Sequence, residues 1–217
     1  MTTARATLVS ARPFDGDSAA ERWLRDVDGE AEAADAVAVL NRILHLQRTA
    51  TADAAVREVA RAQALVARVG VGAGEQVAEG RWAQALDLAG SGGRGRRAAA
   101  LRPQERLAAL LAGRDVALAC EELAMRARGD LAAGRWREGA LQLRIALAAA
   151  LEELAPWAAR GDLGERLTEL GTLQPAAEAA AQQALLGGLD EQAAADVERV
   201  LGRLEAALRA RTAAGFD

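Results

Sequence analysis

The chain has 217 residues, with 31 acidic and 27 basic side chains and a net charge of -4, a balance that argues against wrapping along nucleic acid or lying on an anionic membrane. The one cysteine, Cys120, excludes an intrachain disulfide and a multi-cysteine metal site, and it fits a reducing compartment. The start lacks the apolar core of a secretory signal and no later run is apolar over about 18 residues, so we expect a cytoplasmic protein without a membrane span.

Helical spacing of apolar residues dominates the first half of the chain. Ser18, with Glu21 three residues later, forms a capping-box pattern that predicts a short helix ending near Gly29. The next helix, over 30–48, carries two apolar stripes and is therefore expected to be well buried. Thr51 then predicts the N-cap of a third helix, in which valines recur at helical spacing. The two stripes are Val37, Leu40 and Leu44, and Val39, Ile43 and Leu46.

The segment AGSGGRGRRAAA is the strongest break in the chain, because it has four glycines and no apolar anchor. We therefore predict an N-terminal helical subdomain over 1–90 and a C-terminal helical subdomain over 100–217. A Gly/Arg-rich linker over 91–99 joins them in this interpretation.

The second half of the chain contains clear helix boundaries. Pro103 suits the first position of a helix, and a later stripe through Cys120 predicts another helix, which Gly134 ends as a left-handed C-cap. The expected inward residues after Pro103 are Leu107, Leu110 and Leu111. Further expected boundaries are a break at Pro156, a helix start at Pro175 and a cap at Asp190. The expected ion pairs at i,i+4 are Glu122 with Arg126 and Glu205 with Arg209.

A Gly-Arg-Trp step occurs twice, ending at Trp82 and again at Trp136. We interpret both as tight corners of helical hairpins, in which Gly80 or Gly134 turns the chain and the tryptophan covers the corner. Alanine-rich helices joined by glycine turns can produce the same pattern by composition alone. The predicted fold class is all-α, with antiparallel helical hairpins packed as an irregular bundle or a short array.

The second corner belongs to a longer residue pattern made up of Leu123, Ala127, Gly134, Trp136, Glu138, Gly139, Leu143, Ala146 and Leu147. With this pattern the corner resembles a unit of the tetratricopeptide repeat family, so the short array expected here is tetratricopeptide-like. The resemblance implies antiparallel helix pairs that stack into a protein-binding array. The two corners lie 54 residues apart, from 80 to 134, whereas tandem units of the family repeat about every 34 residues, so a regular array is not expected.

Candidate catalytic residues are few. His45 is the only histidine, so a catalytic triad, a multi-histidine zinc site and a di-iron ligand set all lack parts. Cys120 lies on an apolar stripe beside Glu121 and Glu122, whose charges raise rather than lower a thiol pKa. The glycines between 70 and 74 do not complete a dinucleotide-binding pattern. We therefore predict no catalytic, cofactor-binding or metal-binding residues.

The function expected from this architecture is that of a protein-protein interaction or scaffolding module that self-associates or docks a protein partner. One alternative is an enzyme or small-molecule receptor with an inter-helical pocket, formed by dispersed carboxylates and arginines. Another is a nucleic-acid accessory protein whose Arg94, Arg96 and Arg97 contact an anion. Arginine replaces lysine throughout the chain, so an arginine cluster alone does not indicate phosphate binding, and we favour a solvated linker for this segment.

Overall fold

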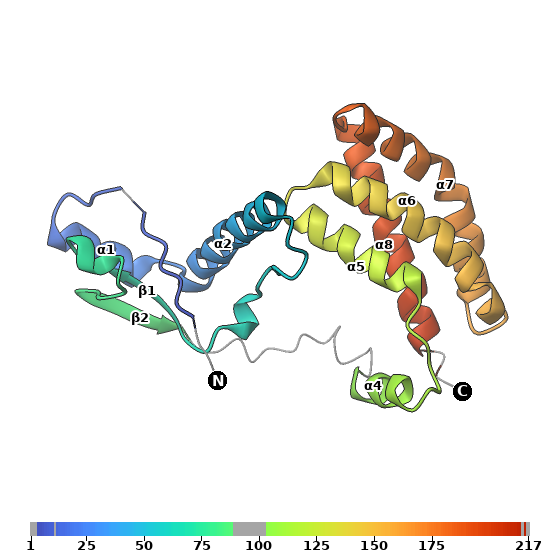
Figure 1. Ribbon diagram of the computed structural model, residues 1–217, viewed down its shortest axis with the longest axis horizontal. Coiled ribbons are helices and arrows are strands. Elements are labelled where there is room, and N and C mark those ends of the chain that lie inside the picture. The colour runs from blue at the N-terminus through green and yellow to red at the C-terminus, as the bar shows by residue number, and fades with distance from the viewer. Residues whose placement is uncertain (1–3, 11, 89–102, 214, 216–217) are drawn as a thin grey trace. The chain divides into compact units, whose positions relative to one another are not determined.

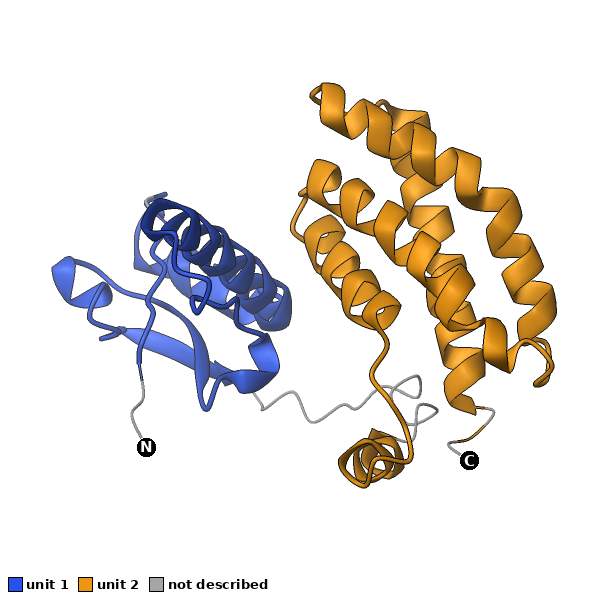
Figure 2. Ribbon diagram, turned by 45° about the vertical axis from the view of Figure 1, so that its right-hand side comes forward, with its two compact units in different colours: residues 1–93 blue, residues 94–217 orange. Residues whose placement is uncertain are grey.

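The computed structural model describes residues 4–10, 12–88, 103–213 and 215. It divides the chain into two compact units, Met1–Gly93 (unit 1) and Arg94–Asp217 (unit 2), which are described separately below (Figure 2). The described part is mostly helical, as predicted, and unit 1 also holds a two-stranded antiparallel sheet. The predicted linker over 91–99, with its arginines at 94, 96 and 97, lies outside the described residues.

Unit 1 packs two helices against one small sheet (Figure 1). The strands pair with Val69 opposite Leu86. Its elements are α1 (Asp17–Asp26), α2 (Gly29–Thr51), the 3-10 turn η1 (Arg61–Gln63), β1 (Ala67–Val71), the 3-10 turn η2 (Glu75–Val77) and β2 (Gln84–Leu88). Among the described residues of this unit, the buried apolar side chains are Leu24, Ala33, Val71 and Val77. The core of unit 1 is therefore small for its length.

Two predicted boundaries in unit 1 are wrong. The first helix begins at Asp17 after Gly16, without a side-chain cap from Ser18. The helix predicted to start at Thr51 does not form, because α2 ends there and its next residue is left-handed. The following segment up to β1 is instead irregular, with turns and the 3-10 turn η1. A Cβ atom at Gly70 would approach the backbone oxygen of Gln84 to 2.7 Å, so glycine allows the close strand pairing that sequence spacing did not reveal.

Unit 2 is built on the helices α5 to α8, with the shorter α4 before them (Figure 1). Its elements are α4 (Pro103–Leu111), α5 (Ala119–Ala132), α6 (Trp136–Glu153), the 3-10 turn η3 (Ala155–Trp157), α7 (Leu163–Leu186) and α8 (Glu191–Ala213). Helix α6 packs against α5, α7 and α8, and α5 also contacts α8. The largest fully buried side chains are Leu143, Leu147, Leu154, Leu163, Leu170, Leu201, Leu204, Val197, Val200 and Cys120. Small alanines between these residues let the helices approach closely.

The helix starts at Pro103 and Asp190 are confirmed, and the Asp190 carboxylate accepts a hydrogen bond from the Ala193 N–H at 2.7 Å. The predicted start at Pro175 is wrong, because α7 continues through this proline. Buried side chains before and after Pro175, including Leu170, hold α7 together despite the missing N–H.

Two side-chain predictions in unit 2 also need correction. On α4, Leu107 and Leu111 are exposed and Ala109 is buried instead. The pairing of Glu122 with Arg126 is confirmed. Glu205 pairs with Arg128 of α5 rather than with Arg209.

Candidate functional site

The first predicted corner is not helical. Gly80 has a φ of 73°, as a glycine turn requires, but it lies with Trp82 between η2 and β2. A Cβ atom at Gly70 would meet the Trp82 ring at 3.0 Å, which places this indole over the sheet. The helical corner predicted at Gly80 and Trp82 is therefore wrong, and the same glycine and tryptophan serve a connection between strands.

The second predicted corner lies between two helices. Gly134 has a φ of 72°, and the N–H groups of Gly134 and Arg135 donate to the last carbonyls of α5. Trp136 begins α6 and packs, partly buried, against the unit 2 core. A depression of about 390 Å³ lies beside it, between this connection and the one at Gly188. Charges of both signs line the depression, from Arg135, Arg137, Glu138, Asp190 and Glu191.

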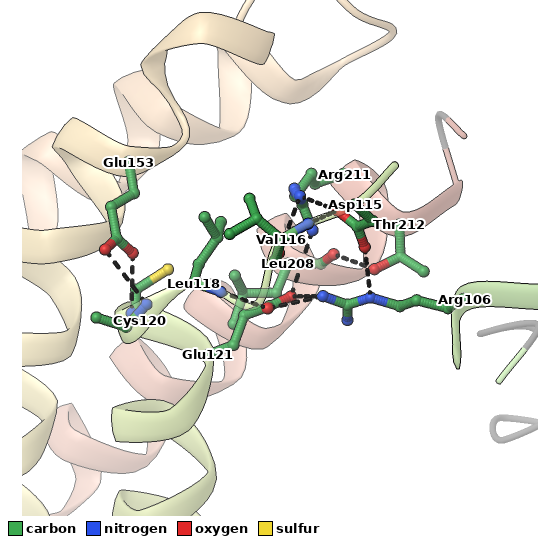
Figure 3. A network of polar contacts seen from close by, with 11 residues as sticks. Arg106, Asp115, Val116, Leu118, Cys120, Glu121, Glu153, Leu208, Arg211 and Thr212 are labelled. Carbon is green, nitrogen blue, oxygen red and sulfur yellow. Dashed lines mark hydrogen bonds and ion pairs between the residues drawn. The ribbon is translucent and has the colours of Figure 1, made fainter. Parts of the chain in front are cut away.

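A buried ionic network ties the segment around Asp115 to the last turn of α8 (Figure 3). Arg211 donates to the Asp115 carboxylate at 2.5 Å, and both side chains are less than 5% exposed. Arg106 donates to Asp115 at 3.1 Å and to both oxygens of Glu121 at 2.5 and 2.7 Å. The Arg211 guanidinium also lies 4.7 Å from the centre of the Trp157 ring, within cation–π range.

The charges of this network balance, with two guanidinium groups against two carboxylates. Burial alone would raise the pKa of Asp115, but the Val116 N–H and the hydrogen bonds from Arg106 and Arg211 outweigh it and lower that pKa. A carboxylate held in this way is ionised and fully engaged, so it is a poor general base. The network is therefore a structural clasp that joins α4, α5 and α8.

Cys120 is unsuited to nucleophilic chemistry. It is fully buried, and burial together with the neighbouring Glu153 raises the pKa of its thiol to about 12. The Glu153 carboxylate accepts hydrogen bonds from the backbone N–H groups of Ala119 and Cys120, and so caps the start of α5 from α6. Of the two carboxylates that the sequence placed beside the thiol, Glu121 raises the thiol pKa through its charge, as predicted, but burial and Glu153 raise that pKa more.

Helix α2 of unit 1 presents an apolar face that no described residue of unit 1 covers. Val39, Ile43 and Leu46 are 49%, 56% and 58% exposed, although the sequence predicted them to be well buried. We call these three residues the α2 apolar face. The sheet packs against the other side of α2, where Ala33 is buried. The α2 apolar face is therefore a candidate interaction surface, since contiguous exposed apolar side chains mark such sites.

The polar residues of α2 do not form a catalytic group. The Asn41 amide exchanges two hydrogen bonds with the backbone of Val59, at 2.8 and 2.9 Å, and so fixes the segment that follows α2. His45 is half-buried, and within the described ranges no carboxylate hydrogen-bonds to its ring.

Comparison with known proteins gives no relative: no family model, no curated protein and no solved structure matches the chain. Within the residues that the structure describes, no group of histidine, cysteine and acidic side chains could hold a metal ion. No described helix combines the length and apolar character needed to cross a membrane.

Sequence reasoning missed both the ionic clasp and the exposure of α2. Asp115 and Arg211 lie 96 residues apart, and nothing in the spacing of acidic and basic residues pairs them. The exposure of Ile43 could not be predicted from the sequence, for another reason. Two apolar stripes on one helix normally indicate burial between neighbours, but in unit 1 only one of the two stripes has a neighbour.

Proposed function

We propose that this chain is a protein-protein interaction module that binds another protein molecule through the α2 apolar face. The observation that carries the proposal is the exposure of Val39, Ile43 and Leu46 on one side of a regular helix. A helix with such a face binds by laying it against an apolar surface of a partner.

The small core of unit 1 supports this proposal. Four apolar side chains among its described residues are buried, whereas unit 2 buries more than twenty. Covering the half-exposed α2 apolar face would gain roughly 1 kcal/mol for each of its three side chains, taking about half of the gain for a fully exposed Leu, Ile or Val. Such a gain is large beside the stability of a small domain, so binding would also stabilise unit 1.

Unit 2 would serve this module as a rigid body. We propose that α5 and α6 form an antiparallel hairpin like a tetratricopeptide unit, joined by the turn at Gly134. The close approach at Gly139, where a Cβ atom would meet Leu131 at 2.8 Å, supports this arrangement. A cytoplasmic location is proposed with it, because the single thiol suits a reducing compartment.

Photo-cross-linking tests the proposed function. A photo-reactive amino acid is placed at position 43 of the full chain, and a matched control carries it at position 145, because Ile145 of α6 is exposed to the same degree. Each protein is irradiated alone and in lysate of its source cells. An intermolecular adduct at position 43 that position 145 does not give is the expected result. No such adduct in either setting, or equal adducts at both positions, would overturn the proposal.

A further inference from the structure

We propose that the molecule covering the α2 apolar face is a second copy of this chain, docked with its α2 helix antiparallel to the first. This inference rests on the proposed function and identifies the partner. It is argued from the positions of charged residues along and around α2.

The charges of α2 are segregated along its length. Glu30, Glu32 and Asp35 lie in its first two turns, and Arg42 and Arg48 lie in its second half. A parallel copy would set like-charged ends beside each other. An antiparallel copy sets the acidic end of each helix beside the basic end of the other, which also opposes the two helix dipoles.

Two of these charges flank the α2 apolar face on the same side. At 100° per residue, Asp35 and Arg42 lie about 20° apart around the helix and two turns apart along it. Both are exposed, and neither forms an ion pair within the described part of the chain. They are therefore free to pair with charges on another molecule.

A two-fold axis that crosses α2 between Asp35 and Arg42 gives both residues an oppositely charged partner on the second copy. In an antiparallel pair of identical helices, the flank of one faces the same flank of the other in reverse order. With the axis near Val39, Asp35 lies opposite Arg42 of the second copy, and Arg42 lies opposite Asp35 of that copy. Val39 then packs at the centre, and Ile43 lies near the small Ala36 of the second copy.

Charge reversal tests this arrangement in the full chain by sedimentation velocity over a range of concentrations. The wild type is expected to show a monomer-dimer equilibrium. Asp35→Arg and Arg42→Asp alone should each weaken the dimer about tenfold, because each change replaces two attractions with two repulsions. The double variant should restore the affinity to about the wild-type value, since the exchanged charges again face each other.

Matched controls carry the same charge changes elsewhere. Glu122→Arg and Arg126→Asp reverse an exposed ion pair on α5, and they should leave the dimer unchanged. Circular dichroism checks that every variant keeps its helices. The inference is overturned by a wild type that is monomeric at every concentration, by single reversals without effect, or by a double variant that fails to recover.

Different experimental results would overturn the inference and the proposed function. If the chain is monomeric and position 43 cross-links to a different protein in lysate, the second copy is ruled out and the interaction module stands. If position 43 gives no intermolecular adduct alone or in lysate, both are ruled out. An adduct of twice the chain mass in purified protein, lost in either single charge reversal and recovered in the double variant, supports both.

Discussion

Replacing Arg211 with methionine should strongly destabilise unit 2. Methionine retains much of the apolar volume of the arginine side chain, so the loss of stability comes mainly from removal of the guanidinium charge. In the variant, Arg106 would be the one guanidinium in the clasp against two carboxylates, Asp115 and Glu121. Because the Asp115 and Arg211 side chains are 3% and 4% exposed, removing one partner leaves a buried charge uncompensated, which costs about 3 to 5 kcal/mol.

Urea unfolding followed by helical circular dichroism measures this loss, and Arg126→Met is the matched control. Arg126 belongs to an exposed pair on α5 and should cost less than about 0.5 kcal/mol. A loss under about 1 kcal/mol for Arg211→Met would refute the assignment of the clasp as a main stabilising contact.

The stability that Arg211→Met loses should also depend on pH. The pKa of Asp115 in the folded chain lies below its usual value of 3.8, so the stabilisation that this carboxylate provides is present above that pH. It is lost as the pH falls through the folded-state pKa. The difference in unfolding free energy between wild type and Arg211→Met should therefore narrow on acidification below pH 3.8. A difference that stays constant over this range would show that Asp115 is not the partner.

Three further predictions concern unit 2. Cys120 should resist a thiol reagent at pH 8 in the folded chain and react once the chain is unfolded, because the thiol is buried and its pKa is about 12; rapid labelling of the folded chain would contradict this. Leu147→Ala should lower the unfolding free energy by about 2 to 5 kcal/mol, since Leu147 is fully buried, and a loss below about 1 kcal/mol would place it outside the core. Asp190→Ala should cost about 1 kcal/mol through loss of the cap on Ala193, whereas an unchanged denaturation midpoint would show that the cap is dispensable.

The helices of unit 2 were largely predictable because their signals are local. A proline at a first turn, a capping aspartate and a glycine after a last turn each act within a few residues, and Pro103, Asp190 and Gly134 all lie where these rules place them. The helix start predicted at Pro175 was wrong because α7 packs against the core both before and after this proline, and that packing overrides a local helix breaker. Tertiary packing of this kind leaves no trace in a window of a few residues.

Unit 1 was harder to predict for a related reason. The valines before Gly70 recur at helical spacing, yet strand pairing across that glycine decides the structure. The repeated glycine and tryptophan at Gly80 and Trp82 also occur in a different context from those at Gly134 and Trp136. A short motif fixes a turn, but the elements on either side of it depend on long-range contacts.

The central claim is that a second copy of this chain covers the α2 apolar face in solution, and the accessibility of position 43 in purified protein tests it most directly. Ile43→Cys and the matched control Ile145→Cys are each purified as the 217-residue chain and labelled with a thiol reagent at high and low concentration. Cys120 is buried and should not react in either variant. The account predicts that position 43 is protected at high concentration and becomes accessible on dilution, while position 145 labels at one rate throughout. Equal labelling of both positions at every concentration would contradict it, as would protection of position 43 that dilution does not relieve.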